Sequence, residues 1–299
     1  VSDGIKTYAA GDSFLVGTQL TVIPNYADPA KDVLYNLTVN GTDYTSAGSA
    51  TLVPTSDISG MAIYWNGTDL PILPTLSDNS WTMIKIASQT NSIPSTWNVG
   101  DTKTFTYDGV EYTARLVDKT GKFTRVSDGS TAYLSFEVTE LLPDYEVYNS
   151  PANNRPTQSQ LLAKMNSGAI WDKVDPSLRS ALEDVNVQVS QGGGTSTEGT
   201  IINWTGKLFL PREHDLYSSR NVSVQNEWNM ITQDQYYQDN NTNSARRKCM
   251  KSTSLGQDHY WEMSPYAGGS AVVCVVWING GASSDGSTSR SGVALRFAL

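Results

Sequence analysis

The 299-residue sequence contains only two cysteines, Cys249 and Cys274, and only two histidines, His214 and His259. Two cysteines are too few for a disulfide scaffold. We expect two isolated buried thiols, although the pair could also form a single disulfide. The scarcity of histidine argues against a histidine-rich metal site. We therefore expect neither a metal ion nor another cofactor.

Long apolar runs and basic charge are also missing. No apolar stretch approaches the ~20 residues that a membrane-spanning helix needs, so we expect no membrane insertion. The formal net charge is −9, which argues against a nucleic-acid partner. The one basic run, Arg246-Arg247-Lys248, has no aromatic residues interleaved with it. We interpret this run as a solvated or salt-bridged patch.

The chain does contain enough apolar sequence, 38% of its residues, to form a core. Segments near the N-terminus alternate apolar with polar residues, at 18–26, 33–45, 50–55 and 61–67. Asn40-Gly41 lies between two strand-like runs and favours a hairpin, because both central positions of a type I′ turn take positive φ. We predict a small antiparallel, sandwich-like β domain over residues 1–74, which would serve for attachment or assembly.

Residues 75–299 combine strand and helix patterns. We predict a strand or short helix at 81–87 and strands at 102–107, 110–117, 133–139 and 207–210. A turn at Asp108-Gly109 would join the second and third of these segments. A short strand ending at Val189 and a helical turn at 213–217 are predicted further along.

Two helices are predicted between these strands. Their apolar faces consist of Leu161, Leu162 and Met165 in the first helix, and of Leu178, Ala181, Leu182 and Val185 in the second. Asp175 is the expected N-cap of the second helix, and Pro176 takes its first position. Strands followed by helices and further strands indicate an α+β domain rather than a wound parallel sheet.

Nothing in the sequence indicates catalysis, and we expect that the protein is not an enzyme. His214 lies in Pro-Arg-Glu-His-Asp, where a role at a helix end is expected. Neither cysteine has a neighbouring base. The segment Gln191-Gly-Gly-Gly lacks the Lys-Ser/Thr of a phosphate-binding loop and is predicted to be a flexible loop. The Asp-Gly turns lack the ligand spacing of an EF-hand.

The last forty residues are the most distinctive part of the chain. Large apolar residues open and close this segment, and a mixture of small and polar residues lies between them. A segment that is anchored at both ends and miscellaneous in the middle is typical of a scaffold that presents a surface. We expect buried or fixed positions for Trp261, Pro265, Gly292 and Phe297. We expect one exposed face to contain Ala271, Ile278, Ser283, Ser284, Asp285, Gly286, Thr288 and Arg290.

Four stretches carry a resemblance to a known family: TWNVGDTKTFTYDGVEYTARLV, DPSLRSALEDVNV, KLFLPREHDLY and YWEMSPY…GVALRFAL. They include a Trp-x-x-Ser-Pro…Gly-Val framework at Trp261, Ser264, Pro265, Gly292 and Val293. Over roughly the last three quarters of the chain, they resemble the variable proteins of diversity-generating retroelements from gut phages and bacteria. The resemblance implies a C-type-lectin fold related to the formylglycine-generating-enzyme group, with a variable region over about residues 260–299.

In such proteins, mutation at template adenines scatters codons among a few small and polar residue types. The resemblance therefore implies a binding site made of Tyr266, Gly269, Ala271, Val272, Val275, Trp277, Ile278, Ser283, Ser284, Asp285, Gly286, Thr288, Ser289 and Arg290. Tyr266 and Trp277 would be the aromatic anchors. Both could equally be structural, since Trp277 ends the apolar run Val-Val-Cys-Val-Val-Trp-Ile. No calcium-dependent sugar-binding motif is present in the sequence.

The function implied by the resemblance is receptor binding. A phage tail protein or a bacterial surface protein of this kind would recognise a host cell-surface protein or glycan. Assembly as a homo-oligomer would raise a weak monomer affinity. Two alternatives stay open: a structural virion or cell-surface protein without a diversified site, and a cysteine-dependent enzyme of the formylglycine-generating type.

Overall fold

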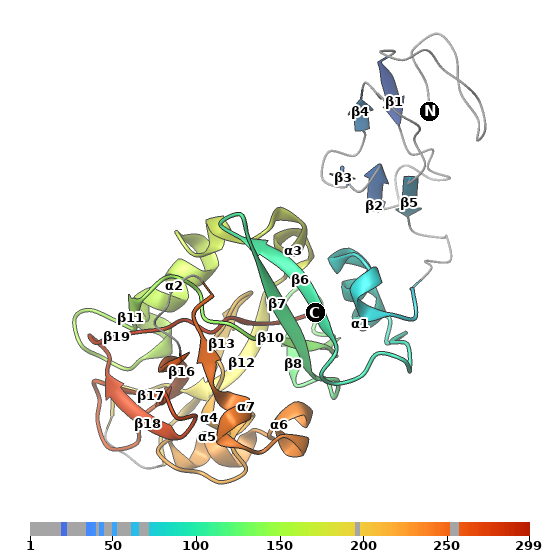
Figure 1. Ribbon diagram of the computed structural model, residues 1–299. Coiled ribbons are helices and arrows are strands. Elements are labelled where there is room, and N and C mark those ends of the chain that lie inside the picture. The colour runs from blue at the N-terminus through green and yellow to red at the C-terminus, as the bar shows by residue number, and fades with distance from the viewer. Residues whose placement is uncertain are drawn as a thin grey trace. The chain divides into compact units, whose positions relative to one another are not determined.

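The computed structural model describes residues 19–22, 34–39, 42–44, 50–52, 61–65, 72–194, 198–251 and 257–299. Its class is α+β, as predicted, with mostly antiparallel strands in several small sheets and a few short helices (Figure 1). The chain divides into two compact units, residues 1–73 with 79–84 and residues 74–78 with 85–299. In the described part, no helix combines the length and apolarity needed to cross a membrane.

The first unit contains two small antiparallel sheets. Their strands are β1 (Leu20–Val22) with β4 (Ala50–Leu52), and β3 (Thr42–Asp43), β2 (Leu34–Val39) and β5 (Met61–Trp65) in that order. Val39 pairs with Thr42, so a two-residue connection joins β2 to β3. The predicted Asn40-Gly41 turn itself lies outside the described residues. The sandwich-like packing of the two sheets stays a prediction.

Residues 81–87, predicted as a strand or a short helix, form part of helix α1 (Trp81–Gln89). The hydroxyl of Ser80 accepts a hydrogen bond from the N–H of Met83 at 3.2 Å, which satisfies one of the free donors at the start of the helix. Met83 and Ala87 are buried. The burial of residues four apart is the pattern of a helix that packs one face.

Two four-stranded antiparallel sheets form the centre of the second unit, with the orders β20-β10-β7-β6 and β13-β12-β8-β9. The bounds of the first are β6 (Thr102–Tyr107), β7 (Val110–Asp118), β10 (Ser135–Val138) and β20 (Arg296–Ala298). Those of the second are β8 (Phe123–Arg125), β9 (Thr131–Ala132), β12 (Val185–Ser190) and β13 (Ile201–Gly206). The β6–β7 hairpin is confirmed, and Asp108 and Gly109 have φ of 53° and 75°, as a type I′ turn requires.

One strand prediction and one helix prediction need correction. Residues 207–210 are not a strand, and within them Phe209 forms only an isolated bridge with Arg296. The strand lies earlier, in β13, where Ile201 pairs with Ser190 of β12. Val185 was expected on a helix but begins β12, because the helix before it has already ended.

Short helices connect these sheets. They are η2 (Leu76–Asp78), η3 (Pro156–Gln158), α2 (Gln160–Ser167), η4 (Trp171–Lys173), α3 (Pro176–Ala181), α4 (Glu213–Leu216), α5 (Gln225–Met230), α6 (Gln235–Asp239) and α7 (Asn243–Arg246). The predicted cap of α3 is confirmed, since the Asp175 carboxylate accepts the N–H of Ser177 at 2.7 Å. Leu182 is the C-cap of α3 and lies outside its helical turns.

The core of the second unit is partly ionic. Arg296 of β20 is fully buried, and its guanidinium pairs with Asp215 at 2.8 Å and also contacts Asp234. The ammonium of Lys248 lies 2.8 Å from Glu137. The Arg296 pairs tie the first four-stranded sheet to α4 and to the start of α6, and the Lys248 pair ties it to β14 (Lys248–Cys249).

This ionic core decides between the two interpretations of the basic run at residues 246–248. Arg246 and Lys248 are buried, and only Arg247 between them is exposed. The run is therefore salt-bridged through Lys248 but is not a solvated patch.

Candidate binding surface

A three-stranded antiparallel sheet contains most of the segment that the sequence distinguishes. It consists of β16 (Tyr260–Pro265), β17 (Val272–Val276) and β18 (Ala282–Gly286), in that order. All of β16 is buried, whereas β18 is half-buried along its whole length. In Figure 1, β18 is the outermost of the three strands. A short pair, β11 (Glu146–Val147) with β19 (Arg290–Ser291), follows it.

The apolar frame around this sheet is buried, as predicted. Trp261, Pro265, Gly292 and Phe297 are all buried. The indole N–H of Trp261 donates to the carbonyl oxygen of Glu146 at 2.8 Å, so its single polar atom has a partner. Both ends of the segment are therefore fixed in the core.

Most of the predicted binding residues are accessible. Those that are exposed or half-buried are Tyr266, Gly269, Ala271, Val272, Trp277, Ile278, Ser283, Ser284, Asp285, Gly286, Thr288, Ser289 and Arg290. Val275 is the exception, because it is fully buried in the middle strand of the sheet. Its inclusion in the site is wrong.

The accessible residues follow one edge of the sheet. Because β17 and β18 are antiparallel, the loops 266–271 and 287–290 meet at one end of the pair. The N–H of Ser287 donates to the carbonyl oxygen of Ala271 there, at 2.8 Å. The turn 277–281 lies at the other end, about 17 Å away along β17. We call the strip formed by β18, this turn and the two loops the edge surface.

Asn154 holds the first of these loops in place. It is fully buried, and its amide nitrogen donates to the carbonyl oxygens of Gly269 and Val272 at 2.8 and 2.9 Å. Its amide oxygen accepts the N–H of Gly193 at 2.6 Å. One side chain thereby joins the loop before β17 to the glycine-rich segment after β12.

The described part of that glycine-rich segment depends on its glycines, while the prediction of a flexible loop stays a prediction. Gly192 and Gly193 have φ of +68° and +76°, a region that favours glycine. A Cβ atom on Gly192 would lie 2.5 Å from the carbonyl oxygen of Asn154. Glycine is therefore required for the close approach of the two loops.

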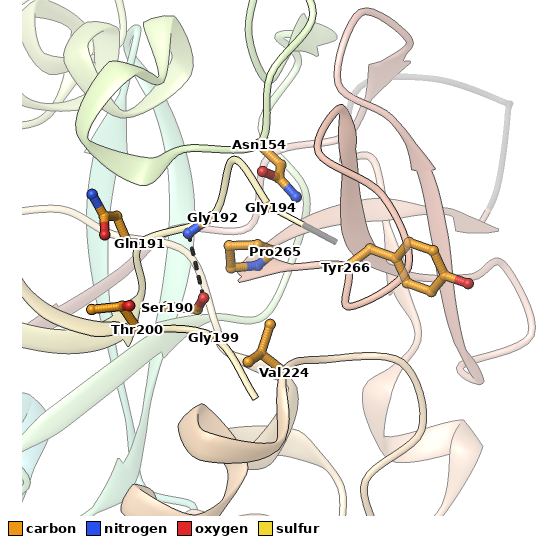
Figure 2. Close-up of a pocket in the computed structure, with 10 residues that line it drawn as sticks. All are labelled: Asn154, Ser190, Gln191, Gly192, Gly194, Gly199, Thr200, Val224, Pro265 and Tyr266. Atoms are coloured by element: carbon orange, nitrogen blue, oxygen red, sulfur yellow. Dashed lines mark hydrogen bonds between the residues drawn. The ribbon is translucent and has the colours of Figure 1, made fainter. Parts of the chain in front are cut away.

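A small cavity of about 140 Å³ opens between these loops. Figure 2 shows its polar side chains, among them Asn154, Ser190 and Thr200, with Pro265 beside them. The side chain of Tyr266 also lines the cavity, but its hydroxyl group points away from it. A polar cavity of this size has room for water molecules, which need about 10–15 Å³ of such volume each.

Two large apolar side chains are exposed at the other end of the edge surface. Trp277 and Ile278, the first residues of the turn after β17, are 42% and 46% exposed. The alternative in which Trp277 is a core residue is therefore wrong. The ring of His259 lies 5.1 Å from that of Trp277, between centroids, and its Nδ1 atom lies 2.8 Å from the Asp258 carboxylate.

Two side chains from elsewhere in the chain form hydrogen bonds with the backbone of the turn that carries Trp277 and Ile278. The Arg247 guanidinium donates to the carbonyl oxygen of Asn279 at 3.1 Å, and the Tyr217 hydroxyl donates to that of Gly280 at 3.2 Å. Gly280 has φ of +83°, and a Cβ atom there would lie 1.9 Å from the carbonyl oxygen of Asn243. The exposure of the two apolar side chains is thus built into the turn.

Two buried glutamates belong to this region, Glu262 within β16 and Glu227 in α5. Neither carboxylate oxygen of Glu262 has a hydrogen-bond partner among the described residues. Burial, reinforced by Glu213 and Glu227, raises the pKa of Glu262 well above its ordinary value. Burial likewise raises the pKa of Glu227 to about 7, against hydrogen bonds from Ser264 and the Ser190 N–H. Both groups favour their protonated form.

Cys274 and His214 both pack against other parts of the fold. Cys274 is fully buried, and burial raises the pKa of its thiol well above the ordinary value. The His214 ring stacks on Trp228 with 3.5 Å between centroids, and its Nδ1 atom lies 2.7 Å from the Trp228 carbonyl oxygen. Both cysteines are free thiols, but Cys249 is exposed, contrary to expectation. Over the described ranges, no three His, Cys, Asp or Glu side chains gather in a metal-binding arrangement.

Sequence reasoning did not assign His259 or Asn154 to this site. His259 immediately precedes the Tyr-Trp framework, and the register of β16 with β17, in which Tyr260 lies opposite Val276, places it beside Trp277. This register is not visible in the sequence, so no local signal predicts the pairing. Asn154 carries no such signal, because its partners Gly269 and Val272 lie more than a hundred positions away in the chain.

Comparison with known proteins adds no relative. None of the protein-family models, curated protein sequences or solved structures that were compared with the chain matches it.

Proposed function

We propose that the protein is a binding protein and that the edge surface recognises a molecule on the surface of a host cell. The chemistry is complementarity rather than reaction. In this proposal the chain is displayed on a phage virion or on a bacterial cell, and its partner is a cell-surface protein or glycan. A C-type-lectin scaffold with a diversified final segment, as the resemblance implies, is part of the same proposal.

The exposed pair of Trp277 and Ile278 carries this proposal. Burying one such side chain fully is worth about 1.5–3 kcal/mol, yet the turn holds both in water. Isolated exposed apolar residues need no explanation, but two neighbours on a fixed turn form a candidate anchor. Tryptophan is also enriched among the residues that dominate binding energy at interfaces.

The composition of the rest of the edge surface supports the same conclusion. Ser283, Ser284 and Asp285 are half-buried and supply short polar groups on a strand whose neighbours are fixed. Substitutions at exposed positions usually change stability by less than about 0.5 kcal/mol. Such a surface can therefore vary while the buried frame stays folded.

Cell binding tests the proposal. The purified protein, labelled with a fluorophore, is incubated with a panel of gut bacterial strains and measured by flow cytometry. We expect binding to a subset of strains, with a loss of about tenfold or more in Trp277→Ala and Ile278→Ser. Val126→Ser is the matched control, since Val126 is β-branched like Ile278 and is 49% exposed in the turn that follows β8. Binding that Trp277→Ala and Ile278→Ser leave unchanged would refute the proposal.

The diversified origin of the segment has a separate test in DNA. If a retroelement generated it, the encoding genome contains a near-copy of the coding sequence for residues 260–299 beside a reverse-transcriptase gene. The two copies should differ at adenine positions of the template. A genome without such a near-copy would remove the diversification hypothesis while leaving the binding proposal to the cell assay.

A further inference from the structure

The outer edge of β18 presents unpaired backbone groups in a fixed pattern. The N–H of Trp277 donates to the carbonyl oxygen of Gly281, and that of Ser287 donates to Ala271, each at 2.8 Å. Hydrogen-bonded and non-hydrogen-bonded pairs alternate in an antiparallel ladder. The register of β17 with β18 therefore makes Ser283 and Asp285 the residues that bond to β17.

The residues between them face outward. The N–H and C=O groups of Ala282 and Ser284 point away from β17, and no described residue forms a hydrogen bond with them. Gly286 differs, because its N–H donates to the Asp285 carboxylate at 2.7 Å and its carbonyl oxygen accepts the N–H of Ser289 at 2.8 Å. Free backbone groups are thus confined to the stretch from Ala282 to Ser284.

This edge lacks the usual protection against strand pairing. Natural edge strands are commonly blocked by lysine, proline or a bulge. The sequence of β18 is Ala-Ser-Ser-Asp-Gly, and its pairing with β17 is regular over all five residues. Ala282 and Ser284 therefore carry none of these blocking features themselves.

An apolar contact lies beside the same edge. Trp277 and Gly281 pair across the end of β17 and β18, so Gly281 stands between the indole ring and the free edge. Because Gly281 has no side chain, the Trp277 ring is accessible from that direction. A side chain on an added strand, about 10 Å from the backbone of Trp277, would be within reach of the ring.

From this geometry we propose that the partner of the edge surface is an extended polypeptide segment that pairs with β18 as an additional strand. Its backbone bonds to the N–H and C=O groups of Ala282 and Ser284, and one of its apolar side chains packs on Trp277. This is the strand-addition mode of peptide recognition, in which main-chain bonds give affinity and side-chain contacts give selectivity. The inference rests on the proposed function, and it selects a protein rather than a glycan as the partner.

Two substitutions at one position test the backbone contact. Ser284→Pro removes the outward N–H, whereas Ser284→Ala removes only the hydroxyl group. Proline is tolerated on edge strands, and circular dichroism with a thermal melt confirms that both variants fold. The probe is a library of random dodecapeptides displayed on yeast and selected against the wild-type protein.

We expect the selected peptides to bind wild type and Ser284→Ala within about twofold and to bind Ser284→Pro at least about tenfold more weakly. They should also carry a large apolar residue and lose affinity for Trp277→Ala. Failure to select any peptide would overturn the inference. So would selected peptides that bind Ser284→Pro as well as Ser284→Ala, because recognition would then not use the backbone.

The cell assay separates this inference from the proposed function. Cells that bind the protein are treated with proteinase K or with periodate, and binding should be lost after the protease only. Loss after periodate alone would identify a glycan partner, which overturns the strand-addition inference but leaves the binding function intact. If no strain binds while the selected peptides still distinguish Ser284→Pro from Ser284→Ala, the host-recognition proposal fails and the strand-addition site stands.

Discussion

The amide nitrogen of Asn154 donates a hydrogen bond to the carbonyl oxygen of Val272, 118 positions later in the chain, at 2.9 Å. The same nitrogen donates to Gly269, so the loop before β17 is held at two points by one buried side chain. A loop positioned in this way can change its exposed side chains without changing its path. The shape of the edge surface at this end depends on Asn154 more than on the residues that form the surface.

Replacing Asn154 by alanine should therefore destabilise the protein strongly. The substitution removes the three hydrogen bonds that this buried side chain makes to Gly193, Gly269 and Val272, which we expect to cost about 3 kcal/mol in the free energy of unfolding. Urea denaturation measures the change. Asn153→Ala is the matched control, because the side chain of Asn153 bonds only to neighbouring backbone groups. Equal destabilisation by the two variants would contradict this account.

Two glycines separate the cost of backbone conformation from the cost of contact. Gly192 and Gly129 have φ of +68° and +72°, so alanine at either position costs about 1–2 kcal/mol through the backbone alone. A Cβ atom on Gly129 meets nothing, whereas one on Gly192 collides with the Asn154 carbonyl oxygen. We expect Gly192→Ala to destabilise by a further 1–3 kcal/mol, on the order of an overpacking defect. Equal thermal melting shifts for the two variants would show that the loops are not in close contact.

Arg296 should be among the most sensitive positions in the chain. Its replacement by methionine removes the cation that Asp215 and Asp234 share and leaves only Arg212 and Lys122 beside these buried carboxylates. Breaking a buried ion pair typically costs about 3–5 kcal/mol, and we expect the lower end of that range here. Lys164→Ala breaks an ion pair with Glu146 of similar length, 2.7 Å, but the lysine there is 41% exposed. That substitution should cost less than about 1 kcal/mol. The urea midpoints of the two variants test this difference. Similar shifts in both would show that the buried ion pairs of Arg296 do not stabilise the fold more than the exposed pair does.

Local sequence patterns predicted the structure correctly wherever it depends on residues that are neighbours in the chain. The hairpin at Asp108-Gly109 follows from turn chemistry, and the start of α3 follows from the Asp175 cap. The burial of Trp261 and Phe297 follows from their size within an apolar frame. In each of these cases, the residues that determine the outcome lie within a few positions of one another.

Prediction failed where distant residues decide the outcome. Lys248 was expected in solvent or in a salt bridge, but the sequence did not reveal that its partner is Glu137, 111 positions away and in the core. Val275 belongs to the same mixture of small and apolar residues as the accessible Val272 and Ile278, yet it lies in the middle strand of a three-stranded sheet. The exposure of Trp277 depends on the strand ending at Val276, which an unbroken apolar run does not reveal. The outward direction of Ser284 likewise requires the register with β17.

Folding lowers the pKa of one buried carboxyl group, Glu137, and raises that of another, Glu227. The free energy of unfolding should therefore be largest in mild acid. Although burial opposes it, the charges of Lys248, Arg296 and Arg115 lower the pKa of Glu137 to about 2. The unfolded chain then binds more protons than the folded one below the ordinary value of 4.5, so stability is lost as the pH falls toward 2. Burial raises the pKa of Glu227 to about 7. Here the folded chain binds more protons, so stability is lost as the pH rises from 4.5 to 7.

Glu227→Gln tests the predicted loss of stability as the pH rises. The rise in pKa from 4.5 to about 7 corresponds to about 3 kcal/mol, which the wild type should lose over that interval and the variant should retain. Glu262, whose pKa is raised in the same direction, contributes a remaining slope in both proteins. Urea midpoints measured through this pH range give the comparison. Glu111→Gln, at an exposed position of β7, controls for the removal of one negative charge. If wild type and Glu227→Gln weaken in parallel as the pH rises, Glu227 is not the group that titrates.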